Sequence, residues 1–178
     1  MTDDELLTMV EEASFRYYWE ADESHSGMTR ENTPGNDDIV ALGASGFGVM
    51  AIIVGAERGF ITRAQAVDRL LRITSFLATA DRYHGAWPHF LSGSTGKRLP
   101  VFDIYDNGAD LVETSFLMEG LLASRQYFKG DGLSGKNCTS ASPGSGRAST
   151  GIGFAPLRNA MLSTGIGRLN IHSTSPIV

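Results

Sequence analysis

The chain has 178 residues, a formal net charge of −5 and 42% hydrophobic residues, which suits one ordinary domain with an apolar core. This balance excludes a strongly basic nucleic-acid-binding face, and the single cysteine excludes a disulfide framework or a paired-cysteine zinc site. The N-terminus MTDDELL is acidic where a secretory signal is basic, and the apolar run 49–54 is too short to span a membrane. As it stands, the chain is expected in the cytoplasm, unless an upstream signal for the periplasm or secretion was lost.

The first predicted helix covers residues 3–20 and is amphipathic. Thr2 and Glu5 open it with the spacing of a capping box. A loop is expected over 22–38, where Ser, Asn, Pro and Gly dominate. A second helix is predicted from about 45 to 58, and because it is apolar nearly all round it should be buried. Its large apolar side chains are Phe47, Met50, Ile52, Ile53 and Val54.

A third, amphipathic helix is predicted over 62–80, again with a capping-box start, and a broadly apolar fourth helix from about 109 to 128. The alternation predicts helical hairpins in which outer and inner helices take turns. Long loops, 21–42 and 81–107, precede the two inner helices, and functional residues tend to lie on such loops. No strands alternate with the helices, which excludes a nucleotide-binding α/β fold.

Three carboxylates surround the start of the fourth helix in the segment DNGADLVETSF. Asp110 and Glu113 are one turn apart on one face, and Asp106 lies just before them. Hydrolytic acid–base chemistry needs one carboxyl group that is protonated and another that is ionised. A helix N-terminus favours the charged form, so Asp110 is the more natural base or water-orienting group. Plain helix capping, with Asp106 or Asn107 as the cap and the other acids in the first turn, explains the same residues equally well.

The loop segment HGAWPHFL offers Trp87, whose aromatic face suits a sugar ring, and His89, which can hydrogen-bond hydroxyl groups. Arg30 and Glu31 in the first long loop are further candidates for binding a polyol. The alternatives are a buried tryptophan that closes the loop over the core and charges that are merely solvated. Glycines at the start of the second helix are expected to permit close helix packing. No metal or cofactor site is expected. The run from Asp22 resembles the start of a calcium-binding loop, but it lacks the glutamate that closes such a loop.

Taken together, five segments carry a family resemblance: FRYYWEAD, SGMTRE, GASGFGVMAIIVGAERGFITRAQA, ADRYHGAWPHFL and GADLVETSFLMEGLLASRQYF. Over about residues 5–131 the chain resembles the glycoamylase-like family, which is similar to endo-β-1,2-glucanases and to the glucanase-like region of cyclic β-1,2-glucan synthases. The resemblance implies an all-α fold, the N-terminal fragment of an (α/α)6 barrel. It also implies that Asp106, Asp110 and Glu113 line a pocket and hydrolyse a β-1,2-linked glucan with inversion.

The last part of the chain departs from that family. All 20 acidic residues lie before Gly132, and 46 residues without a carboxylate are expected by chance roughly once in a few hundred chains. The tetrapeptide Thr-Gly-Ile-Gly begins at Thr150 and at Thr164. Codons for Thr-Gly-Ile-Gly can encode Trp-X-Trp when they are read from the third base of the threonine codon. The family resemblance implies Trp-X-Trp segments in this part of the chain. We therefore predict residues 1–132 as barrel and 133–178 as an irregular, low-complexity tail that is translated out of frame.

Two functions remain open at this point. In the first, the gene descends from one for a glucan hydrolase. This chain has only four of the twelve helices of a barrel, so it is expected to be truncated and inactive. The alternative is a non-catalytic helical remnant, or a fragment that binds glycans or other partners. In that case the inner faces of the second and fourth helices stay uncovered. The linkage cleaved, endo or exo action, the acid and base roles and the oligomeric state do not follow from the sequence.

Overall fold

The computed structural model describes residues 1–105 and 107–129, which hold four α-helices and two short strands. In chain order these are α1 (Asp3–Glu20), β1 (Ile39–Ala41), α2 (Leu42–Glu57), α3 (Arg63–Thr79), β2 (Phe90–Ser92) and α4 (Leu111–Tyr127). The four predicted helices are confirmed. However, α2 begins at Leu42 rather than near residue 45, because β1 runs into it directly and no side chain caps it.

The outer helices α1 and α3 begin where their capping boxes predicted. The Thr2 hydroxyl accepts from the Glu5 backbone N–H at 3.2 Å, and the Glu5 carboxylate accepts from the Thr2 N–H at 2.7 Å. Thr62 and Gln65 repeat this arrangement at α3, with distances of 3.2 and 2.9 Å. Each box satisfies backbone donors that a helix N-terminus otherwise leaves unpaired, and so it fixes the first turn.

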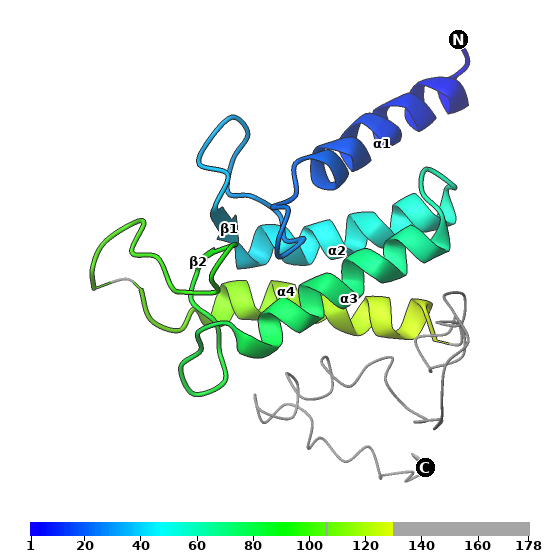
Figure 1. The fold of residues 1–178 in the computed structure, drawn as a ribbon. Coiled ribbons are helices and arrows are strands. Elements are labelled where there is room, and N and C mark those ends of the chain that lie inside the picture. The colour runs from blue at the N-terminus through cyan, green and yellow to red at the C-terminus, as the bar shows by residue number, and fades with distance from the viewer. Residues whose placement is uncertain (106, 130–178) are drawn as a thin grey trace, which may run out of the picture.

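The inner helices α2 and α4 lie side by side and run in the same direction (Figure 1). Two glycines permit this close approach. A Cβ atom on Gly120 would lie 2.5 Å from the carbonyl oxygen of Gly46, and a Cβ on Gly46 would overlap the backbone of Phe116. The expected role of the glycines in close helix packing is therefore confirmed. α1 and α3 also contact α2, so the core lies around this helix.

One face of α2 and α4 is nevertheless open to solvent in the described residues. Phe47 has 52% of its surface exposed and Phe116 has 40%, and the two rings lie 5.4 Å apart. Met50 and Val54 on α2 are exposed with them. The prediction that this helix is buried therefore holds for only part of its surface, because α1, α3 and α4 cover only part of its circumference. The uncovered apolar faces expected for a four-helix remnant are present.

The two long loops meet through a small antiparallel sheet that the sequence did not predict. β1 pairs with β2 so that Val40 lies opposite Leu91 and Ala41 lies opposite Phe90. Both strands lie at the end of the molecule where α2 and α4 begin (Figure 1). The sheet therefore holds the loops that precede the inner helices at one end of the fold.

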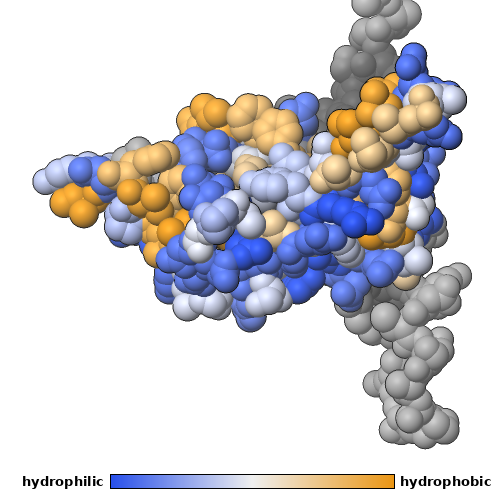
Figure 2. Space-filling model, turned by 90° about the horizontal axis from the view of Figure 1, so that it is seen from above, coloured by the Kyte–Doolittle hydropathy of each residue, from blue (hydrophilic) through white to orange (hydrophobic). Residues whose placement is uncertain are grey.

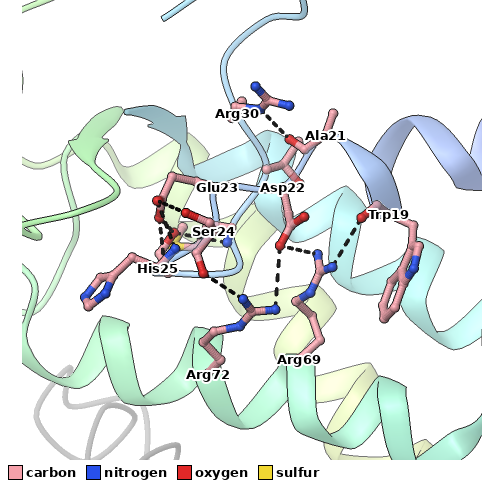
Figure 3. Close-up of polar contacts among 12 residues, drawn as sticks. Trp19, Ala21, Asp22, Glu23, Ser24, His25, Arg30, Arg69 and Arg72 are labelled. Atoms are coloured by element: carbon pink, nitrogen blue, oxygen red, sulfur yellow. Dashed lines mark hydrogen bonds and ion pairs between the residues drawn. The ribbon is translucent and has the colours of Figure 1, made fainter. Parts of the chain in front are cut away.

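A buried ion pair fixes the start of the first loop on α3 (Figure 3). The Asp22 carboxylate lies 3.0 Å from a terminal nitrogen of Arg69 and 3.6 Å from one of Arg72. Arg69 also donates to the carbonyl oxygen of Trp19 at 3.2 Å, and its guanidinium lies 4.3 Å from the centre of the Trp19 ring. Burial lowers the pKa of Arg69 and the Asp22 charge opposes this shift. Because the pair is almost fully buried, it fixes the path of the loop.

Some predicted features lie outside the described residues, namely Asp106, the boundary near residue 132 and the tail 133–178. Within residues 1–105 and 107–129, no helix combines the length and the hydropathy that a membrane crossing requires.

Candidate active site

Asp110 precedes the first residue of α4 and uses its two carboxylate oxygens differently. Oδ1 accepts from the backbone N–H groups of Val112 at 2.9 Å and of Glu113 at 3.0 Å, so Asp110 is the N-cap of the helix. Helix capping is therefore observed, but the cap is Asp110 and not Asp106 or Asn107, because α4 begins at Leu111. Oδ2 points elsewhere and lies 3.1 Å from Nδ1 of His89. The same side chain thus has one oxygen for the helix and one for a neighbouring site.

Glu113 stands in the first turn of α4 and reaches the start of α2. Its Oε2 accepts from the Gly43 backbone N–H at 2.6 Å and lies 3.8 Å from Nε2 of His89. A Cβ atom at position 43 would lie 2.6 Å from that same oxygen, so glycine leaves room for the Glu113 carboxylate in this position. Two helix N-termini therefore meet at one carboxylate, and their partial positive charges stabilise a negative charge there.

His89 lies between the two carboxylates, and each ring nitrogen faces one of them. A neutral imidazole donates from one nitrogen and accepts at the other. With the proton on Nδ1, His89 donates to Asp110 and presents a lone pair to Glu113. The backbone of His89 is fixed as well, since its carbonyl oxygen accepts from the N–H of Leu42 at 3.1 Å. We refer to Asp110, His89 and Glu113 as the acid–histidine cluster.

The structure contradicts the predicted sugar contact of Trp87. Its side chain has 0% of its surface exposed, so the alternative of a tryptophan buried under the loop is correct. Its backbone positions α4 instead. The Trp87 N–H donates to the Thr114 hydroxyl at 3.0 Å, and its carbonyl oxygen accepts from the N–H of Asp110 at 2.8 Å. Trp87 therefore orients the helix start that carries the cluster.

Arg30 and Glu31 do not hydrogen-bond or pair with the acid–histidine cluster in the described residues. The Arg30 Nε donates to the carbonyl oxygen of Ala21 at 3.0 Å, and its guanidinium pairs with Asp37. Arg30 therefore stabilises the first loop. The side chain of Glu31 is exposed, while its backbone N–H donates to the carbonyl oxygen of Ile39.

Sequence reasoning missed Phe102, which lies beside the cluster. Its ring centre is 5.0 Å from that of His89 and 5.0 Å from that of Phe90, yet 61% of its surface is exposed. The available signal was the segment 101–105, in which every residue except Asp103 is apolar or aromatic. No group of three or more His, Cys, Asp or Glu side chains suited to a metal ion occurs in residues 1–105 and 107–129.

Comparison with known proteins shows what this chain is similar to. An exo-β-1,2-glucooligosaccharide sophorohydrolase (non-reducing end) of Parabacteroides distasonis is 62% identical over 128 residues. A crystal structure of a β-1,2-glucanase from the same species matches with a TM-score of 0.71 and 62% identity over 72% of this chain. An endo-β-1,2-glucanase of Chitinophaga pinensis, in complex with sophorotriose and glucose, matches with a TM-score of 0.69 and 51% identity over 77% of this chain.

Over this stretch the chain is homologous to β-1,2-glucanases. This finding confirms the resemblance that the sequence segments carried, and with it an all-α fold related to the glucanase barrels. No protein-family model matches the chain. The chain spans 18% of the length of the Parabacteroides sophorohydrolase and of the Parabacteroides crystal structure, and 33% of the Chitinophaga structure. The matched region is thus a minor part of each relative.

Proposed function

We propose that this chain is part of a glycoside hydrolase that cleaves β-1,2-linked glucan, with Asp110 and Glu113 as catalytic carboxylates. The observation that carries the proposal is the acid–histidine cluster at the meeting point of two helix N-termini, in a chain 62% identical to a β-1,2-glucooligosaccharide hydrolase. Both carboxylates are partly exposed and can meet a substrate.

The geometry favours a negative charge on both acids. Asp110 accepts two backbone N–H groups and faces Nδ1 of His89, which suits a carboxylate that acts as base or water-orienting group. Glu113 accepts the Gly43 N–H at 2.6 Å where two helices begin, which favours the same charged form. In the reaction, a protonated carboxyl group donates to the departing glycosidic oxygen, while a water molecule gives its proton to one of these carboxylates and attacks the anomeric carbon. Asp106 remains a predicted third carboxylate of this site.

A reducing-sugar assay on β-1,2-glucan tests whether this chain is catalytic or is the truncated, inactive hydrolase that the four helices of its described residues predict. Glu113→Gln should abolish hydrolysis, because an amide can neither accept nor deliver the transferred proton. Glu119→Gln is the matched control, since Glu119 is exposed on the same helix and should leave the rate unchanged. A β-1,4-linked glucan should be hydrolysed poorly or not at all. If the unaltered chain releases no reducing ends from β-1,2-glucan, catalysis by this chain is refuted.

The second candidate function is a non-catalytic fragment that associates through its apolar surface. The exposed side chains of Phe47, Met50, Val54 and Phe116 on adjoining faces of α2 and α4 favour it. An inactive chain that binds a hydrophobic dye and unfolds without a cooperative transition would support this alternative.

We also propose that residues 133–178 are translated out of the reading frame of the barrel. The absence of acidic residues after 131 and the two Thr-Gly-Ile-Gly segments support this proposal. Translating the DNA after codon 132 in the neighbouring frame tests it directly. Trp-X-Trp segments and a continuing barrel sequence are expected there, and their absence would refute the frame slip.

A further inference from the structure

An exposed aromatic ring adjoins the acid–histidine cluster. Phe102 contacts His89 and Phe90 at near-perpendicular angles of 81° and 72°, so two rings hold it in place. With 61% of its surface exposed, much of Phe102 still faces solvent. His89 in turn lies 3.1 Å from Asp110, so this ring is one side chain away from a proposed catalytic carboxylate.

The neighbours of Phe102 extend this apolar surface. Val101, Ile104 and Tyr105 are also exposed, and hydrophobic patches lie among polar residues on the protruding end of the molecule (Figure 2). Large apolar side chains gathered in one exposed loop usually mark a binding surface. Sugar sites combine such surfaces with a few polar groups, because a pyranose ring has apolar C–H faces and a rim of hydroxyl groups.

We propose that Phe102 is the aromatic wall of a glucose-binding subsite beside Asp110, His89 and Glu113, a position that Trp87 cannot fill because it is buried. This inference rests on the proposed function and adds the residue that positions the sugar. The C–H face of one glucose unit stacks on the Phe102 ring, while its hydroxyl groups reach the polar cluster.

Saturation-transfer difference NMR on the full chain with a β-1,2-linked glucose trisaccharide tests this proposal without requiring hydrolysis. Phe102→Leu keeps an apolar side chain but removes the ring, and should weaken the apparent affinity about two- to tenfold. Phe102→Tyr restores a ring and should bind like the unaltered chain. Tyr17→Leu removes an exposed ring from the outer helix α1 and should change nothing. Circular dichroism checks that each variant keeps its helices.

The outcomes separate this inference from the proposed function. If Phe102→Leu binds the trisaccharide as tightly as the unaltered chain while Glu113→Gln abolishes hydrolysis, the subsite is refuted and the hydrolase stands. If Phe102→Leu weakens binding but the chain never cleaves glucan, the subsite stands as a glycan-binding site. If the unaltered chain does not bind the trisaccharide, or if Phe102→Leu alters only self-association in sedimentation, the subsite is refuted.

Discussion

Substitutions at Asp110 separate a helix cap from a catalytic group, because its two oxygens have different partners. Asp110→Ala removes the acceptor of two backbone N–H groups at 2.9 and 3.0 Å. Loss of such a cap costs about 1 kcal/mol, and loss of a negative charge at a helix N-terminus costs about 0.5 kcal/mol more. Asp110→Asn keeps the capping oxygen and loses only the charge. The expected destabilisation is therefore about 1.5 kcal/mol for alanine and about 0.5 kcal/mol for asparagine.

Urea unfolding followed by circular dichroism measures the stability difference, and the reducing-sugar assay measures activity. Both Asp110 variants should lose hydrolysis, although asparagine preserves most of the stability. Thr62→Ala is the matched control, because it removes the cap of α3 away from the site. It should cost about 1 kcal/mol without changing activity. If Asp110→Asn hydrolyses glucan as the unaltered chain does, Asp110 is only a cap and its catalytic role is refuted.

Two further predictions concern the scaffold. Gly120→Ala should lower the unfolding temperature, because the added Cβ would lie 2.5 Å from the Gly46 carbonyl oxygen. Overpacking costs about 1–3 kcal/mol of stability, whereas alanine in place of a helical glycine gains about 1 kcal/mol in helix propensity, so a net loss is expected. Gly108→Ala, where an added Cβ meets no atom within 4 Å, is the control. A higher melting temperature for Gly120→Ala would contradict the close approach of α2 and α4. The second prediction concerns Glu23. Burial raises the pKa of its carboxyl group, but hydrogen bonds from two backbone N–H groups and a serine hydroxyl lower the pKa by more, so it lies below the ordinary value of 4.5. Its stabilisation is therefore complete above pH 4.5 and is lost as the pH falls through the lower, folded-state pKa. Glu23→Gln should flatten that acid limb in pH-dependent urea unfolding, and an unchanged limb would assign the loss to other carboxylates.

Local sequence signals predicted the helices well because their physical causes are local. The capping boxes at Thr2 and Thr62 join residues three positions apart, and the helices begin where these boxes place them. The interpretation of the α2 glycines also needed little tertiary information, since a glycine inside a helix that is otherwise strongly apolar implies a close neighbour. α2 began earlier than predicted, because its start follows directly on β1, and β1 is held by pairing with β2, a strand distant in the chain.

The candidate site shows the same division. The sequence alone identified DNGADLVET and HGAWPHFL as the segments of interest, and the family resemblance followed from ordered motifs. It did not distinguish capping from catalysis at Asp110, or a buried from an exposed aromatic. Only the folded chain places His89 between the two acids, buries Trp87 and leaves Phe102 open. These outcomes depend on how α2, α4 and the two loops meet, and such long-range contacts leave no periodic pattern in the sequence.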